Sequence, residues 1–273
     1  MVPESVRAMF RLEGQARRLP GGSRPAFRVG DVVVKRLHAR SLETEHSLEL
    51  APWLAGELAR VEEQGFRIAR PVAAQDGRWM LADGWAAWTF VEGRPAEPQD
   101  VPEVIAALQA LHGRLRQVEK HPLLDENTTA WGLAHHRCWE RSVEGLHPRL
   151  GGLVEALYAR YERLPPLECQ LIHGDLNAEN VLLAPGRAPG VVDFTPFWAP
   201  ADFAVAMFAN WIGPRKADMS VLPYFENVPH FDQLLLRAAV RMLWVVSELE
   251  GVQHWETAPE KRAAELVLEL SQR

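Results

Sequence analysis

The amino-acid sequence predicts an α+β protein of two lobes, with a β-rich N-terminal lobe followed by a mainly helical C-terminal lobe. The first ninety residues contain short β-prone segments separated by two-residue turn signals, with one helical insert. After Pro98 the apolar residues recur at helical spacing almost to the C-terminus. A chain of 273 residues is long enough for two lobes that share a cleft. We therefore expect lobes at residues 1–90 and 91–273.

A β-hairpin is expected near the start of the N-terminal lobe. Residues 26–29 and 32–37 are β-prone, and Gly30-Asp31 between them is a two-residue turn signal. The period of two in a strand puts Lys35 on the same face as two apolar neighbours. One lysine therefore lies within an apolar strand of the expected sheet.

A helix and a further strand are expected in the rest of this lobe. Ser41 can cap a helix that runs to about Leu50, and Pro52 either kinks that helix or opens the next. An apolar strand is expected at residues 85–91, where Gly93 closes it. The connector between the lobes therefore begins near residue 91.

The C-terminal lobe contains several helical patterns. Asp100 and Glu103 have the spacing of a capping box, and apolar residues follow them at helical spacing up to Val118. Two short strands are expected around a Pro-Gly turn, at residues 180–183 and 190–194. Further helices are expected at residues 152–163, 202–211, 232–250 and 259–270, the third of them ended by Gly251.

The composition excludes several classes of protein. The net charge is -6 and the pI is about 6.0, so the chain has no basic footprint for a nucleic-acid backbone. Two cysteines, Cys138 and Cys169, make no disulfide framework. The first residues carry charges instead of an apolar signal sequence, and no apolar run reaches the ~18 residues that span a bilayer. We expect a cytoplasmic enzyme that binds neither nucleic acid nor membrane, in an undetermined oligomeric state.

Three oxygen-bearing side chains occur in order within one short region. Asp175 and Asn180 lie on a loop that runs into a strand, and Asp193 lies at the end of the next strand. Phosphoryl transfer needs a carboxylate that orients the attacking hydroxyl and accepts its proton, and it needs oxygen ligands for Mg²⁺. Apolar residues flank all three positions and favour a rigid hairpin around one cavity. The pattern indicates a phosphoryl-transfer site, with a turn of solvated polar residues as the simple alternative.

This pattern resembles the signature of the aminoglycoside phosphotransferase and choline kinase family, the small-molecule branch of the protein-kinase-like fold. The resemblance rests on the H-G-D-x-x-x-x-N run at residues 173–180 and on the apolar D-F at 193–194. It implies a bilobal kinase-like fold for nearly the whole chain, with Asp175 as the catalytic base. It also implies that Asn180 and Asp193 bind Mg²⁺, while ATP or GTP donates its γ-phosphate to a hydroxyl of a small molecule.

The nucleotide-binding residues are expected mainly in the N-terminal lobe. By resemblance, Lys35 pairs with the α- and β-phosphates, and a glutamate on the following helix pairs with Lys35. Glu45 is the first choice, with Glu43 and Glu49 as rivals. The backbone of Phe90 and Val91 lies where the family has the hinge that binds the nucleotide base.

A glycine-rich phosphate loop of the protein-kinase type is missing from the sequence. Gly21, Gly22 and Ser23 occupy its place before the first hairpin, and their backbone amides could cradle phosphate. A plain surface turn explains two adjacent glycines equally well. The assignment of these three residues to nucleotide binding therefore depends on their place in the chain.

The acceptor is the least determined part of the hypothesis. The family takes antibiotics, sugars or amino sugars, choline and similar metabolites, and no activation segment that would suit a protein acceptor follows Asp193. Trp131, Trp198, Trp211 and Trp255 are candidates for a wall of the acceptor site. The alternative from another class is a catalytically silent kinase-like protein that binds a nucleotide or ligand.

Overall fold

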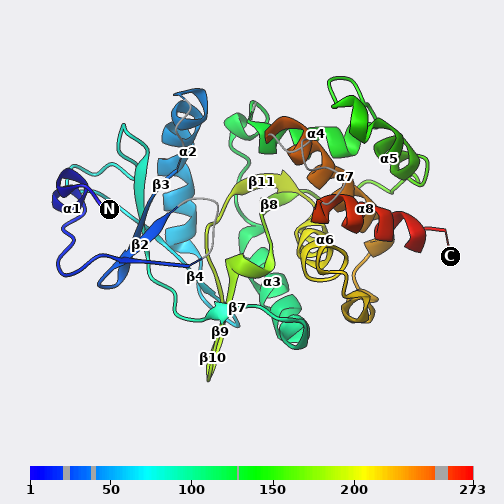
Figure 1. Cartoon of the computed structure of the whole chain (residues 1–273). Helices are drawn as coiled ribbons and strands as arrows, with labels where there is room; N and C mark the ends of the chain where they lie inside the picture. Colours follow the sequence, from blue (N-terminus) through cyan, green and yellow to red (C-terminus); the bar gives the residue numbers. More distant parts are fainter. Residues whose placement is uncertain (21–24, 38–40, 128, 250–257, 273) are drawn as a thin grey trace.

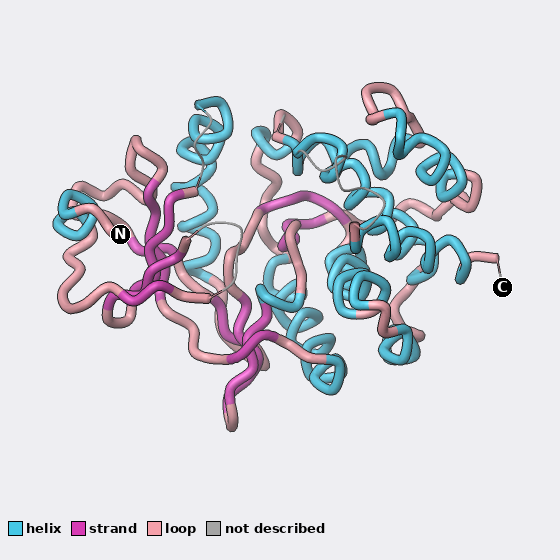
Figure 2. Tube along the Cα trace, in the orientation of Figure 1, coloured by secondary structure: helices cyan, strands magenta, loops and turns pink. Residues whose placement is uncertain are grey.

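The computed structural model describes residues 1–20, 25–37, 41–127, 129–249 and 258–272 (Figures 1 and 2). The N-terminal sheet and helices α1 and α2 lie on one side of the molecule, and most of the later helices lie on the other (Figure 1). The expected α+β architecture, with a β-rich N-terminal part followed by a mainly helical part, is confirmed. No helix in the described ranges has the length and apolar character needed to cross a bilayer.

The N-terminal sheet has five antiparallel strands in the order β1-β2-β3-β6-β5. The expected hairpin is present, because Val29 pairs with Val32 across the turn and Gly30 has a φ of +60°. A positive φ at the first central position matches a two-residue turn that follows the twist of the strands. The strands are β1 (Arg17–Arg18), β2 (Ala26–Val29), β3 (Val32–Arg36), β5 (Pro71–Val72) and β6 (Trp85–Thr89).

One face of this sheet is covered by the short helix α1 (Glu4–Met9), whose Val6 is fully buried. The apolar core between them includes Val34, Trp85 and Ala87. Lys35 lies on the opposite face, as the period of two requires. The chain then enters α2 (Ser41–Arg60), a single helix with Pro52 inside it, so Pro52 does not begin a new helix.

A second sheet, in the order β4-β10-β9-β7, contains strands from both halves of the sequence. β4 (Arg67–Ile68) pairs in parallel with β10 (Arg187–Val191), and β7 (Arg94–Pro95) pairs with β9 (Val181–Ala184). The β9–β10 hairpin is the expected one, but β10 ends two residues before Asp193. A strand from before residue 90 is thus paired within the C-terminal part of the chain.

The helical lobe is built around α6 (Ala201–Ile212), nine of whose twelve residues are buried. α7 packs against both α4 and α6, which places the largest apolar core in this lobe. Between the helices, β8 (Gln170–His173) pairs with β11 (Pro196–Ala199), a pairing that the sequence pattern did not predict. The α-helices are α3 (Val101–Leu115), α4 (Ala130–Glu140), α5 (Pro148–Tyr158), α6 (Ala201–Ile212), α7 (Phe231–Leu249) and α8 (Pro259–Leu270). Short 3₁₀ turns occupy Pro98–Asp100, Pro122–Leu124, Ala178–Asn180, Pro214–Lys216 and Met219–Phe225.

Two expectations about helix ends are wrong. The capping box before α3 joins Glu97 and Asp100, so it lies one turn earlier than the expected Asp100–Glu103 pair. Both carboxylate oxygens of Asp100 also accept hydrogen bonds from Arg94, which precedes α3. α5 begins four residues earlier than expected, because the side chain of His147 caps the helix and Pro148 opens it. Gly251, the expected end of α7, lies outside the described residues.

Candidate functional site

The loop that carries Asp175 is fixed at its first residue, Gly174. The four residues of β8 before it are fully buried, and the Gly174 amide donates to the Thr195 carbonyl over 2.7 Å. A Cβ at Gly174 would overlap the ring of Phe197 on β11. The β8–β11 pair therefore requires glycine here, and it sets where the loop begins.

His173 connects this loop to the strand that precedes Asp193. Its Nδ1 accepts a hydrogen bond from the Asp175 amide at 3.2 Å, and its Nε2 therefore donates to the Val192 carbonyl at 3.0 Å. Burial lowers the pKa of this imidazole to about 4, so the ring stays neutral near pH 7. His173 therefore ties the loop of Asp175 to the residue before Asp193.

The Asp175 carboxyl group is half-buried. Burial raises its pKa to about 6, the nearby charge of Arg241 opposes the rise, and the Asp193 carboxylate adds to it. The positive charge of Lys35 also acts on Asp175 and favours its ionised form. A carboxyl group with a raised pKa is suited to accept a proton, because its pKa lies closer to the pH at which the protein works.

Asn180 is tied to the same loop. Its side-chain amide nitrogen donates to the Asp175 carbonyl over 2.8 Å, and Asn180 is 9% exposed. Asn177 helps to shape this turn, because its side-chain oxygen accepts from the amides of Glu179 and Asn180. With its nitrogen bound to the loop, the side-chain oxygen of Asn180 is the atom suited to a metal ion.

Lys35 and Asp193 form an ion pair across 158 residues of sequence. Lys35 comes from β3, and Asp193 follows β10 with a φ of +58°, a left-handed conformation that is uncommon for residues other than glycine. The pair therefore joins the N-terminal sheet to the region of Asp175 and Asn180. Glu45 lies on α2, but its side chain is outside the described residues, and so is that of Glu43.

The oxygen atoms of Asn180 and Asp193 are ligands of the kind that Mg²⁺ prefers. Mg²⁺ is commonly held by one or two protein oxygen ligands together with the phosphates of a substrate. The Asp193 carboxylate already binds one positive charge in this structure, the ammonium group of Lys35. The chemistry of the Asn180 and Asp193 side chains therefore fits one Mg²⁺. In the described chain, no three His, Cys, Asp or Glu side chains cluster as metal ligands.

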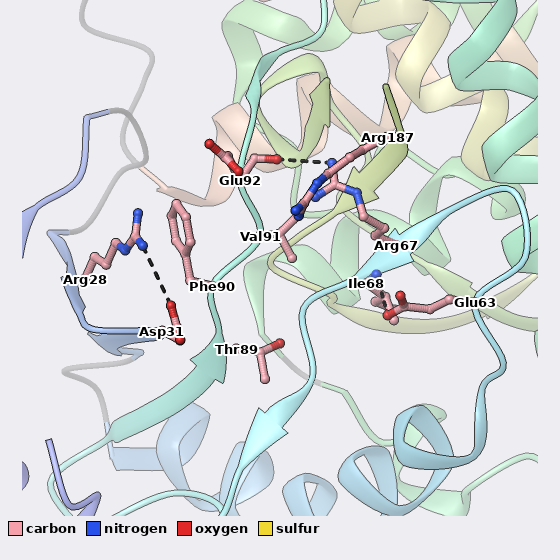
Figure 3. A pocket seen from close by; sticks show the side chains of 10 residues that line it. All are labelled: Arg28, Asp31, Glu63, Arg67, Ile68, Thr89, Phe90, Val91, Glu92 and Arg187. Atoms are coloured by element: carbon pink, nitrogen blue, oxygen red, sulfur yellow. Dashed lines mark hydrogen bonds and ion pairs between the residues drawn. The ribbon is translucent and has the colours of Figure 1, made fainter. Parts of the chain in front are cut away.

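A cavity of about 400 Å³ lies beside residues 89–92, which include Phe90 and Val91 (Figure 3). The guanidinium group of Arg28 lies 3.6 Å from the centre of the Phe90 ring, and Val91 is buried against Gly190. Arg67 crosses the segment, donating to the carbonyl of Glu92 at 3.1 Å. The cavity lining contains none of the four residues of the preceding paragraphs, Lys35, Asp175, Asn180 and Asp193.

Sequence reasoning missed Arg241, which lies on α7 and donates to the Gly174 carbonyl over 2.6 Å. The available signal was an arginine among apolar residues on the buried side of a helix. Asp202, in the first turn of α6, has no described hydrogen bond to this loop, and α6 has no side-chain cap. Trp131, Trp198 and Trp211 all pack against the main core.

Some expected residues cannot be placed. Gly21, Gly22, Ser23 and Trp255 lie outside the described residues. The structure therefore brings together Lys35, Asn180 and Asp193 around the loop of Asp175, and it leaves the expected phosphate loop undescribed.

Solved structures with this fold include several antibiotic kinases. The amicoumacin kinase hAmiN, solved with AMP-PNP, Ca²⁺ and Ami, is 13% identical with a TM-score of 0.62, over 98% of this chain and 92% of that one. A spectinomycin phosphotransferase in complex with ADP and spectinomycin is 14% identical with a TM-score of 0.55, over 98% and 96% of the two chains. APH(2")-IIa in a ternary complex with streptomycin and ATP is 14% identical with a TM-score of 0.56, over 94% and 96%.

The sequence itself also matches a known family. No significant match was found among curated proteins. A model described as the phosphotransferase enzyme family matches residues 15–241. This region contains Lys35, the loop of Asp175 and Asp193, and it spans most of the chain. The protein therefore belongs to the phosphotransferase enzyme family.

Proposed function

We propose that this protein transfers the γ-phosphate of ATP or GTP to a hydroxyl group of a small molecule. The observation that carries the proposal is the approach of Lys35 and Asp193 beside the loop that holds Asp175 and Asn180. One cation, one carboxylate and one amide oxygen there match what a triphosphate with Mg²⁺ requires. Membership of the phosphotransferase family supports the same reaction class.

Asp175 acts as the base in this proposal. Its carboxylate accepts the hydrogen of the acceptor hydroxyl and directs the oxygen toward the γ-phosphorus. The new bond joins the acceptor oxygen to phosphorus, while the bond from phosphorus to the bridging oxygen of the β-phosphate breaks. The raised pKa of Asp175 suits this exchange of a proton near neutral pH.

The nucleotide is held by residues of both lobes, 1–90 and 91–273. Lys35 pairs with the α- and β-phosphates, Glu45 orients Lys35, and the amides of Gly21, Gly22 and Ser23 cover the phosphates. The backbone of Phe90 and Val91 binds the base. Asn180 and Asp193 would hold Mg²⁺, which neutralises charge on the phosphates when it is bound.

The proposed acceptor is an antibiotic, a sugar or an amino sugar, or a related metabolite with a free hydroxyl. The solved neighbours support antibiotics first, because they include complexes with spectinomycin and streptomycin and an amicoumacin kinase. A cytoplasmic location fits a reaction that consumes a nucleoside triphosphate. No nucleic acid or membrane takes part in it.

The first experiment measures Mg-dependent release of ADP or GDP with a panel of acceptors: aminoglycosides, spectinomycin, macrolides, hexoses, amino sugars, choline and homoserine. Asp175→Asn is measured beside the wild type, and nucleotide binding is followed by thermal shift. We expect acceptor-dependent release that the variant loses while it still binds nucleotide. Release that survives in the variant would contradict the assignment of Asp175 as the base. A wild type that neither binds nor turns over nucleotide would favour a silent ligand-binding protein.

A further inference from the structure

Arg241 is a charged residue in the interior of the helical lobe. It lies on α7, is 2% exposed, and has apolar neighbours along the helix. Its Nη2 donates to the Gly174 carbonyl over 2.6 Å, while its Nε has no hydrogen bond among the described residues. No described carboxylate lies within ion-pair distance of its guanidinium group, and the carboxylate whose charge acts on it is that of Asp175.

The surroundings of this guanidinium group compensate it only in part. The ring of Trp131 on α4 lies 5.3 Å from it and the ring of Phe197 on β11 lies 5.4 Å from it. Aromatic faces attract a cation, but they replace a full hydration shell poorly. Replacing buried ionic groups by well-packed apolar side chains of similar volume is often neutral or stabilising. The stability of the fold alone therefore does not explain an arginine at this position.

The hydrogen bond from Arg241 falls on one particular peptide group. The carbonyl of Gly174 and the amide of Asp175 belong to the same peptide plane. His173 accepts the hydrogen bond of that amide, and Arg241 donates to that carbonyl. The plane that leads into Asp175 is thus held at both of its polar ends, and its rotation would break both bonds.

We propose that Arg241 is a positioning residue for phosphoryl transfer, which fixes the Gly174–Asp175 peptide plane and so aims the Asp175 carboxylate. Through its contacts with Trp131 and Phe197, it also couples α4 and α7 to the loop. The proposal rests on the proposed function, because it takes Asp175 as the base. Arg241 touches neither nucleotide nor acceptor in this role.

The same helix offers a matched control. Arg237 lies one turn earlier on α7, is 6% exposed, and also has an Nε without a described hydrogen bond. Its guanidinium group lies 5.2 Å from the ring of Trp139 and 4.2 Å from that of Tyr161. It donates to the carbonyl of Gln233 over 2.7 Å and has no described bond to the loop of Asp175. Replacing Arg237 therefore perturbs a similar buried charge away from that loop.

The test compares Arg241→Met, Arg241→Lys and Arg237→Met in the full chain. Kinetics are measured at a temperature where all variants are folded, with kcat and the nucleotide KM determined separately. We expect Arg241→Met to lower kcat about 100-fold, the size of effect that a 1 Å misplacement of a reacting group can cause. The nucleotide KM should change by less than about threefold. Arg241→Lys should recover part of kcat because it restores a donor, and Arg237→Met should keep kcat within about threefold.

A second measurement needs neither acceptor nor nucleotide. Hydrogen exchange at the Asp175 amide should be faster in Arg241→Met than in the wild type, and unchanged in Arg237→Met. Equal losses of kcat in the two methionine variants, or unchanged exchange at Asp175, would overturn the proposal. If Arg241→Met does not fold, the same comparison is made with Arg241→Lys, whose kcat should still fall more than its nucleotide KM changes. An inactive wild type would refute the proposed function, while the exchange result would still decide whether Arg241 holds the loop.

Discussion

The substitution Gly174→Ala places a methyl group where the ring of Phe197 already lies. The added Cβ would overlap the Cδ2 atom of that ring and lie 2.6 Å from its Cε2 atom. Carbon atoms in contact prefer separations of about 3.5–4.0 Å, so the ring or the loop must move by about 1 Å or more. The ring itself is confined, because Phe197 is 3% exposed and lies 4.6 Å from the ring of His135.

The expected loss of stability follows from this overlap. Overpacking a well-packed core typically costs about 1–3 kcal/mol, and an overlap this deep belongs at the upper end. The movement also displaces the peptide that leads into Asp175, so activity should fall about 100-fold even in the folded variant. Gly113→Ala is the control, because Gly113 lies on α3 with nothing within 4 Å of the added Cβ. Alanine in an open helical position should be neutral or stabilise by up to ~1 kcal/mol.

Urea denaturation measures the free energy of unfolding of both variants, and initial rates of nucleotide release measure their activity. A double variant, Gly174→Ala with Phe197→Ala, separates the overlap from other effects, since removing the ring provides room for the new methyl group. The two substitutions together should cost clearly less than the sum of the two single costs. A Gly174→Ala protein with the stability and rate of the wild type would refute the reasoning about this contact.

Two further predictions follow from the site. Asp193→Ala should abolish the Mg-dependent thermal shift by nucleotide, which in the wild type should reach about 5 °C at 100 times the Kd; an undiminished shift would contradict Asp193 as a metal ligand. Stability should fall as the pH drops from about 6.5 toward 4, because burial lowers the pKa of His112 and His135 to about 3 and that of His173 to about 4. The unfolded chain takes up protons there that the folded chain does not, at about 1.4 kcal/mol per pH unit for each histidine. Asp175, with its raised pKa, opposes this loss below about pH 6. Urea denaturation at pH 7 and pH 5 checks the sign, and equal stability at the two values would contradict it.

Local sequence patterns predicted the elements that depend on near neighbours. The Gly30-Asp31 turn, the helix now seen as α3 and the β9–β10 hairpin all follow from residues within a few positions of one another. The order and spacing of Asp175, Asn180 and Asp193 also belong to this local level. Errors occurred at the ends of elements, where Arg94 draws Asp100 away from its expected cap and His147 starts α5 early.

The sequence by itself therefore determined the reaction class and the order of the candidate catalytic groups, because both follow from residue type and spacing. Only the tertiary structure decided which residues meet. Lys35 binds Asp193 across 158 residues, and Arg241 reaches the carbonyl before Asp175 from a helix 67 residues later. Contacts of this kind depend on how sheets and helices pack. Local periodicity carries no information about which elements, distant in the sequence, come into contact.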